Sequence, residues 1–132
     1  MTVSMPAAKK GDEVVAVDTH IELVPALPAP PIPTPFPHVF RGPLKEALCQ
    51  KVYADDKPCA TKGSKALNKP HVPIAGPFQT PPKDKGTVKT GSSTVFMEGK
   101  AAARHGDIVE TCNDPTDAPV GRIIATSTVI IG

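Results

Sequence analysis

The chain has few of the large side chains that usually fill a protein core. Its 132 residues include no Trp, one Tyr and four Phe. A chain of this length is too short for two ordinary cores. A domain with so few large side chains for its core usually needs an additional stabilising element, such as a metal ion, disulfides or a partner subunit. We therefore expect one small domain over residues 1–132 that depends on such a stabilising element.

The sequence also lacks the marks of several protein classes. Three cysteines are an odd number, so a disulfide framework is not expected. The chain starts without the charged and apolar segments of a signal peptide and contains no transmembrane candidate, which predicts a cytoplasmic protein unless a dedicated machine exports it. The net charge of +2 is small, and acidic residues and prolines interrupt the lysines. Nucleic-acid binding is therefore not expected.

Proline is abundant, with 17 residues in the chain. Seven of the thirteen residues from Pro25 to Pro37 are proline. Because proline fixes φ and has no amide hydrogen, residues 21–43 are expected to form a crossing of extended, polyproline-like backbone or turns, and neither a helix nor an inner strand. A second Pro-rich crossing is expected at about 68–86. Apolar residues such as Ile32 and Phe36 recur in the first crossing, which argues against a flexible linker.

A degenerate internal repeat organises the rest of the chain. Residues 95–107 read as an apolar strand, a tight turn at Glu98-Gly99, a run of small residues and a second turn at Gly106-Asp107. Residues 52–64 match this segment position for position, residues 5–12 repeat its second half, and residues 127–132 repeat the opening of the segment from Ser93. Short strands, regular turns and abundant Thr, Val and Ile predict a mostly β fold with pseudo-threefold internal repeats.

One further segment has an ambiguous pattern. Residues 44–50 are the only good helix formers in a row, and they allow either about two helical turns or a strand.

Each repeat is followed by a strand that ends in a metal-binding type of side chain. These side chains are His20, His71 and Cys112, and His38 closes the first Pro-rich crossing as a natural fourth. Three imidazoles and one thiolate suit a tetrahedral Zn²⁺, and four protein ligands leave no open position for a catalytic water. No local metal-binding spacing supports the site, so a chance scatter of His and Cys is the alternative. The repeat alignment favours one structural zinc ion.

The other reactive residues have simpler interpretations. His105 lies at a turn-proximal position that takes polar residues, so a solvated side chain is expected. Cys59 aligns with alanines and reads as a small buried residue, and Cys49 is given the same default role. Aspartates in turns usually bind nearby backbone amides. Asp114 and Asp117 lack an accompanying nucleophile or phosphate-binding loop, so no enzymatic activity is expected.

The repeats resemble a known family. Residues 6–9 read Pro-Ala-Ala-Lys and residues 101–104 read Ala-Ala-Ala-Arg, and each is followed two residues later by Gly-Asp. This pattern is similar to the Pro-Ala-Ala-Arg repeat (PAAR) proteins, and the Pro-rich crossings are closest to the longer variant of that family. The literal four-letter motif occurs nowhere intact, and the copy at residues 58–61, Pro-Cys-Ala-Thr, is degenerate. The sequence His20-Ile21-Glu22 also stands where short members often have His-Gly-Gly.

The resemblance implies a fold and a function. It implies a cone-shaped domain of short strands, with one structural Zn²⁺ held near the apex by His20, His38, His71 and Cys112. The base would cap a trimeric VgrG-type β-helical spike, one cap per trimer, in a type VI secretion system or a related phage-tail-like contractile injection machine. Ejection would bring transient contact with the target membrane and release into the target cell or the medium. No fused effector domain is expected, so any effector cargo would bind separately.

Two alternatives come from other functional classes. The first is a small zinc enzyme in which water replaces one of the four ligands. The second is a metal-free adaptor that carries effectors to the spike.

Overall fold

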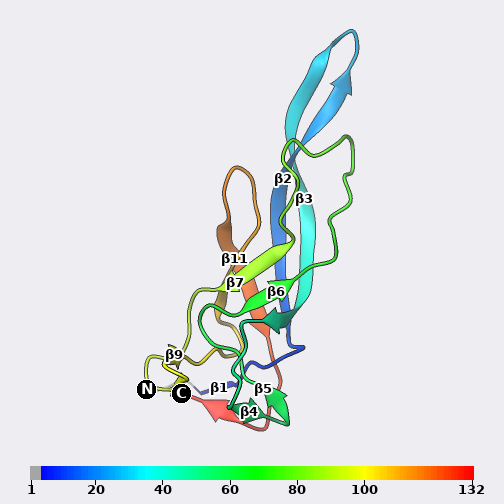
Figure 1. The fold of residues 1–132 in the computed structure, drawn as a ribbon. Helices are drawn as coiled ribbons and strands as arrows, with labels where there is room; N and C mark the ends of the chain where they lie inside the picture. The colour runs from blue at the N-terminus through cyan, green and yellow to red at the C-terminus, as the bar shows by residue number, and fades with distance from the viewer. Residues whose placement is uncertain (1–3) are drawn as a thin grey trace.

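The structure is a computed structural model that describes residues 4–132, and it is mostly β as predicted (Figure 1). The expectation about a signal peptide rests partly on residues 1–3, which lie outside the described residues. No helix occurs within residues 4–132, so this part of the chain has no helical membrane span. The strands are β1 (Met5–Pro6), β2 (Glu13–Ala26), β3 (Ala29–Glu46), β4 (Tyr53–Ala54), β5 (Lys57–Pro58), β6 (Lys65–Leu67), β7 (Lys85–Val88), β8 (Phe96–Met97), β9 (Lys100–Ala101), β10 (Ile108–Thr111), β11 (Ala118–Ile124) and β12 (Ile130–Ile131).

Six strands form a closed sheet that gives the molecule its tapered shape. They are hydrogen-bonded in the order β10-β11-β2-β3-β6-β7, and β7 pairs with β10 to close the ring. β2 and β3 are much longer than the others, and their hairpin extends beyond the rest of the sheet to make a narrow end. β1, the C-terminus and the small hairpins lie at the opposite, broad end (Figure 1).

The first Pro-rich crossing is extended as predicted, but it forms a regular strand. Residues 29–46 are β3, which pairs with β2 along nearly its whole length. Pro33 and Pro35 lie opposite Leu23 and Ile21, whose backbone groups instead bond residues 77–79 on the other side of β2. Paired residues in an antiparallel ladder alternate between bonded and non-bonded positions. The alternate prolines therefore occupy non-bonded positions, where their missing amide hydrogen costs no ladder bond.

The structure also tests the predictions for residues 44–50 and for the second Pro-rich crossing. The helical option for residues 44–50 is wrong, because β3 continues to Glu46 and pairs there with β6. Tertiary pairing overrides the helix propensity of these residues. The second Pro-rich crossing is irregular, as expected, apart from one bridge between Glu22 and Phe78, and β7 begins at Lys85.

The broad end contains three small two-stranded sheets, two of which are hairpins. β4 pairs with β5, β8 pairs with β9, and β1 pairs with β12 from the other end of the chain. The turn at Glu98-Gly99 is confirmed, with φ of 51° and 80°. Such positive φ values at both central residues match the right-handed twist of a two-residue hairpin. Asp107 accepts the amide of Arg104, which is the turn role expected for this aspartate.

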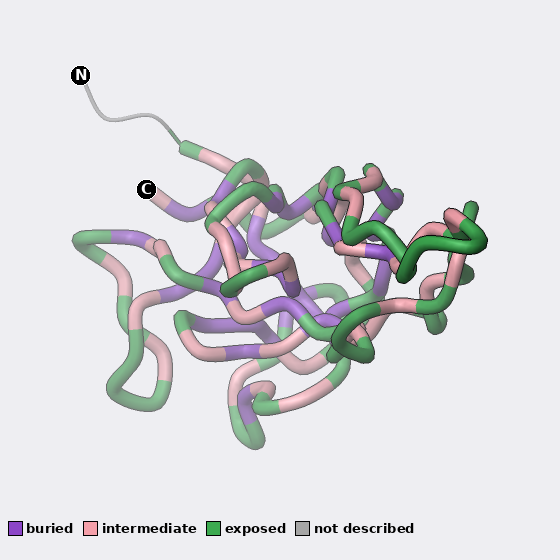
Figure 2. Tube along the Cα trace, turned by 90° about the horizontal axis from the view of Figure 1, so that it is seen from above, coloured by how far each residue is buried: buried purple, intermediate pink, exposed green. Residues whose placement is uncertain are grey.

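A ring of three backbone hydrogen bonds joins the repeat segments. The amide of Ala8 donates to Ala103 O (3.0 Å), that of Ala60 to Ala8 O (2.9 Å), and that of Ala103 to Ala60 O (3.0 Å). All three alanines are fully buried. Only small side chains fit where three backbone segments approach so closely. In the view from above, buried segments lie inside and exposed loops lie at the periphery (Figure 2).

Along the long hairpin, the buried side chains change from apolar to polar with distance from the broad end. Toward the broad end, Val14 of β2 and Phe40 and Leu44 of β3 belong to a fully buried apolar cluster. Further along the same inward face of β2, the buried side chains are Asp18 and Glu22, with His20 between them. The interior at the base of the projecting hairpin therefore holds buried polar groups where an apolar core would be expected, and such groups must be paired or bind an ion.

Candidate metal centre

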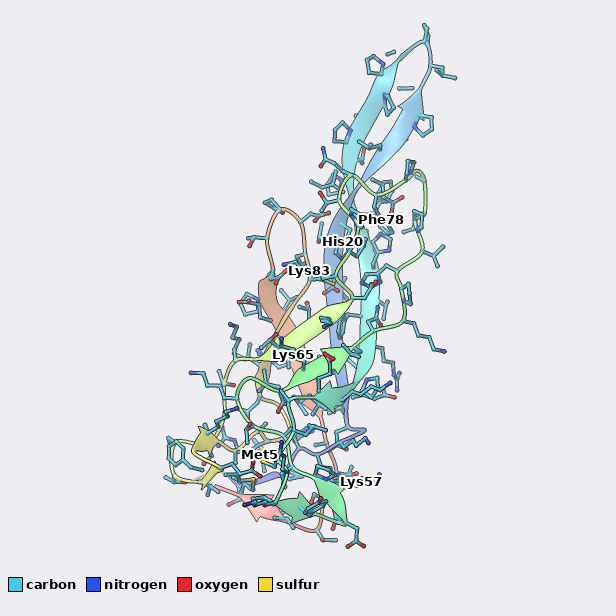
Figure 3. All side chains as sticks on the ribbon, in the orientation of Figure 1. Met5, His20, Lys57, Lys65, Phe78 and Lys83 are labelled. Atoms are coloured by element: carbon cyan, nitrogen blue, oxygen red, sulfur yellow. The ribbon has the colours of Figure 1, made fainter. Side chains whose placement is uncertain are left out.

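The alternation of β2 directs one polar face into the molecule. Asp18, His20 and Glu22 are at most 1% exposed, whereas Val17 is 62% exposed. Side chains two residues apart on a strand share a face. His20 lies well above the broad end and beside Phe78 of the second crossing (Figure 3). The register of the β2–β3 ladder places His38 directly opposite Asp18.

Four potential ligand atoms gather next to this face. They belong to Asp18, His20, His71 and Cys112, and they all lie within 4.8 Å of one another. Asp18 Oδ2 is 3.2 Å from His71 Nε2, 3.5 Å from Cys112 Sγ and 4.0 Å from His20 Nε2. Cys112 Sγ is 3.7 Å from His20 Nε2. These distances describe a compact group of one oxygen, two nitrogens and one sulfur.

The chemistry of this group fits a single tetrahedral ion. Zinc binds nitrogen and oxygen at about 2.0–2.1 Å and sulfur at about 2.3 Å, so neighbouring donors in a tetrahedron lie roughly 3.3–3.6 Å apart. Three of the four separations, 3.2, 3.5 and 3.7 Å, are close to that range, and the fourth, 4.0 Å, is longer. Carboxylate, imidazole and thiolate are all zinc ligands. The residues present therefore fit one structural zinc ion with four protein ligands.

The sequence predicted three members of this group and missed one. His20, His71 and Cys112 come together although they are far apart in the chain. Asp18 was not predicted, although its position two residues before His20 on one strand face is a signal that a strand assignment makes readable. His38 lies beside the group and outside it. The ring of His38 is 5.7 Å from that of His20 and 5.3 Å from that of His71.

His38 and the second crossing share one buried carboxylate, that of Glu22. Glu22 Oε2 is 2.8 Å from His38 Nε2. Glu22 Oε1 accepts the amides of residues 74, 75 and 76 at 2.8, 2.7 and 3.1 Å. Burial raises the pKa of Glu22, but these backbone hydrogen bonds and His38 outweigh that effect and lower it. The ionised side chain therefore ties the crossing that carries His71 to the long hairpin.

Two buried donors of the group, His20 and Cys112, are electrically neutral without a cation. Burial, the largest effect, lowers the pKa of His20, so its imidazole is neutral and can offer a lone pair. Burial and the nearby Asp18 raise the pKa of the Cys112 thiol to about 12. A bound cation would displace the thiol proton, because zinc binds the thiolate. His20 Nδ1 has no hydrogen-bond partner within residues 4–132, and Asp114 Oδ2 lies 3.6 Å away.

The remaining candidates from the sequence lie elsewhere. Cys49 and Cys59 are buried in a second apolar cluster at the broad end, as predicted. Burial raises the pKa of both thiols, that of Cys49 to about 11, which makes them poor nucleophiles. His105 is partly exposed and does not belong to the group of four ligand atoms, and its Nδ1 accepts the Ala125 amide at 3.0 Å. Asp114 accepts the amide of Ile21 at 2.8 Å, a long-range bond to β2 and not the local turn bond that was expected.

Replacing Glu22 by glutamine should loosen the second crossing. Gln is nearly isosteric with Glu but carries no charge and one acceptor oxygen fewer, so three amides and His38 lose a shared ionic partner. We expect a lower thermal midpoint and faster amide hydrogen exchange at residues 74–76. Glu13→Gln is the matched control on the same strand, because Glu13 pairs with Arg41 at the surface. Unchanged exchange at residues 74–76 in the Glu22 variant would contradict this role.

Comparison with known families gives one result. The family model described as the PAAR motif matches residues 41–112 and residues 79–132, and the two matches together cover more than half of the chain. No curated protein matches the chain.

Proposed function

This chain belongs to the PAAR-motif family of spike-tip proteins, and on that basis we propose that it is the sharp tip of a contractile injection machine. The machine is a type VI secretion system or a related phage-tail-like particle. The broad end docks on the blunt end of a trimeric VgrG-type β-helical spike, one tip per trimer. The β2–β3 hairpin points away from the spike. The observation that carries this proposal is the tapered fold with its small hairpins gathered at the broad end (Figure 1).

Three exposed apolar side chains make the broad end suitable for a threefold partner. Val52, Val95 and Val129 hold equivalent places, because each accepts the amide of a repeat residue (Cys59, Ala102 and Ala7) at 2.9–3.0 Å. The residues that follow these valines are Tyr53, Phe96 and Ile130, which are 57%, 62% and 55% exposed. Successive side chains alternate in direction along a strand. Val52 and Val95 pack against the second apolar cluster, and Val129 is 38% exposed, so in each of the three places the residue after the valine is the more exposed one.

Binding to a trimeric spike tests this proposal. Burial of exposed apolar groups at three similar positions against a partner with threefold symmetry would be energetically favourable. We expect one chain per spike trimer by native mass spectrometry. Tyr53→Asp together with Phe96→Asp should weaken binding by at least about tenfold, because each charge would be buried on docking. The measurement is titration of the purified tip into the purified trimer.

A matched control separates docking from a general surface effect. Val72 is 76% exposed but lies in the second crossing, outside the small hairpins. Val72→Asp should bind the spike like the unmodified chain. Equal binding by the Tyr53/Phe96 variant and the unmodified chain would contradict docking through these hairpins.

A structural Zn²⁺ at the base of the projecting β2–β3 hairpin is the second part of the proposal. The tip must stay folded while it is driven through a membrane, and the interior at the base of its projecting hairpin has polar residues in place of an apolar core. An ion that joins β2, the second crossing and the end of β10 removes loop-closure entropy from the unfolded chain and adds metal-binding free energy. The family is structural, and the tip has no enzymatic role in this proposal.

The life cycle follows from this role. The protein lies in the cytoplasm until it is assembled on the spike, and firing carries it into the target cell or the medium. Contact with the target membrane is transient. Effector cargo, where there is any, binds separately.

One observation favours a zinc enzyme as the second candidate. A cavity of about 120 Å³ is lined by His20, Cys112 and Asp114 among other residues. An ion with three protein donors and one water, facing this cavity, would favour the enzyme. Four protein donors would favour the structural role.

A further inference from the structure

We propose that two carboxylates in the hairpin turns of the broad end, those of Asp55 and Glu98, are positioning residues for docking on the spike. Each one fastens its own hairpin to the start of a neighbouring repeat, so that the three small sheets form one ring before the spike binds. This inference rests on the docking part of the proposed function. A ring of this kind fits a threefold-symmetric surface, because it presents three similar apolar positions at a fixed spacing.

The two carboxylates occupy equivalent positions in their repeats. Asp55 lies three residues after Val52, and Glu98 lies three residues after Val95. Each is the first residue of a two-residue hairpin turn, with φ of 49° at Asp55 and 51° at Glu98. A positive φ is unfavourable for glutamate, and residues held in such a conformation often have a functional role. Glu98 therefore stands where glycine or asparagine would suit the turn better.

The partners of the two carboxylates are equivalent as well. Glu98 Oε2 accepts the amides of Gln50 at 2.8 Å and Lys51 at 2.9 Å. Asp55 Oδ2 accepts the amide of Thr128 at 3.0 Å, and the hydroxyl of Thr128 donates to Asp55 Oδ1. Lys51 and Thr128 each stand directly before the valine of their repeat. The same carboxylate-to-amide bond thus joins neighbouring repeats at two junctions.

The third junction uses a serine in place of a carboxylate. Ser92 Oγ accepts the amides of Thr94 at 3.1 Å and Val95 at 2.9 Å. Thr94 stands directly before the valine of its repeat, so its amide is equivalent to those that the turn carboxylates accept. Gly132 stands where the other two repeats have the carboxylate, and its carbonyl oxygen accepts the hydroxyl of Ser92. Side-chain hydrogen bonds therefore connect all three repeats in a ring.

The turn carboxylates are exposed but ionised at neutral pH. Hydrogen bonds from Thr128 lower the pKa of Asp55, and the backbone amide of Lys51 is the main cause of the lowered pKa of Glu98. Hydrogen bonds to an ionised acceptor are stronger than those between neutral groups. At neutral pH both carboxylates therefore accept these bonds in their charged form.

The small sheets need such bonds to keep their places. Each strand of the two hairpins has only two residues, and an isolated two-stranded hairpin is marginally stable at best. Tyr53 and Phe96, the exposed aromatic residues of the docking surface, each lie two residues before a turn carboxylate. When only some chains hold all three sheets at the right spacing, the apparent affinity falls in proportion.

Removal of both carboxylates tests their role in docking. Asp55→Gly together with Glu98→Gly removes the bonds, and glycine suits the positive φ of both turns. We expect binding to the purified VgrG-type trimer to weaken by at least about tenfold, mainly through slower association. Asp56→Gly is the matched control, because Asp56 is the exposed second residue of the same turn, with φ of 64°, and its side chain makes no hydrogen bond or ion pair within residues 4–132.

The outcome of this titration separates the inference from the proposed function. The Asp56 variant should bind like the unmodified chain. Equal binding by the double variant and the unmodified chain would overturn the positioning role and leave docking intact. Failure of the unmodified chain to bind the trimer would overturn docking itself, and the positioning role with it.

Two further measurements distinguish positioning from a direct charge contact with the spike. Glu98→Gln keeps a carbonyl oxygen that can accept both amides, so it should retain most of the affinity that Glu98→Gly loses. Equal losses in these two variants would overturn the proposal. In the free chain, Glu98→Gly should speed amide hydrogen exchange at residues 50–51 and leave Thr128 unchanged, and Asp55→Gly should do the reverse. Unchanged exchange at both places would also overturn it.

Discussion

Removal of the metal should lower the thermal midpoint of the protein by at least about 15 °C, because structural zinc contributes on the order of 10 kcal/mol of apparent binding free energy. The total stability of a domain is typically only 5–15 kcal/mol, so the loss is a large share of it. Cys112→Ser should have the same effect, since it removes the thiolate donor. The measurements are elemental analysis and thermal unfolding, with and without a strong chelator.

Cys49→Ser is the matched control for this prediction. Cys49 is also a buried cysteine, 6% exposed, but it lies in the apolar cluster at the broad end. Its variant should keep one zinc per chain and keep its response to chelator. A protein that is prepared with care, holds no metal and unfolds identically with and without chelator would contradict the structural ion and favour the metal-free adaptor.

The affinity for the ion should rise with pH. Burial raises the pKa of the Cys112 thiol to about 12 in the chain without metal, so at neutral pH the ion must displace a proton. Each proton released makes binding stronger as the proton concentration falls. Calorimetric titration with Zn²⁺ in buffers of different ionisation enthalpy gives the number of protons released. This number should fall in Cys112→Ser.

The repeat pattern explains why much of the fold was readable from the sequence. Turns such as Glu98-Gly99 carry a local signal, because few residues adopt positive φ easily. The gathering of His20, His71 and Cys112 was readable because each follows a repeat unit at a similar distance. These features depend on local chemistry and on spacing along the chain, which a single sequence displays directly.

The features that were missed depend on register. Whether a proline-rich segment forms a strand depends on which side of the strand each missing amide faces. That side is set by the pairing of Pro33 and Pro35 with β2 and by the backbone of residues 77–79. Asp18 and Glu22 were missed for a similar reason. Their inward direction follows from the length of β2, which runs to Ala26, whereas the sequence predicted a strand that ended at His20.

Phe40→Ala should be the most destabilising single change in the apolar part of the core, at about 3–5 kcal/mol. Phe40 is the largest fully buried side chain. Its ring lies 6.4 Å from that of His71, so it connects the apolar cluster to the metal centre. The cavity left by alanine removes contacts on both sides, and the chain has few other large residues to fill it. Urea unfolding gives the free-energy difference.

Phe96→Ala is the control for the Phe40 variant, because Phe96 is 62% exposed at the broad end. A surface substitution of this kind should change the free energy of unfolding by less than about 0.5 kcal/mol. Phe40→Ala should also weaken zinc binding, since His71 loses the ring that packs against it. An equal loss of stability in the two variants would contradict a core organised around Phe40. Unchanged zinc affinity in Phe40→Ala would show that the metal centre holds His71 without support from the apolar core.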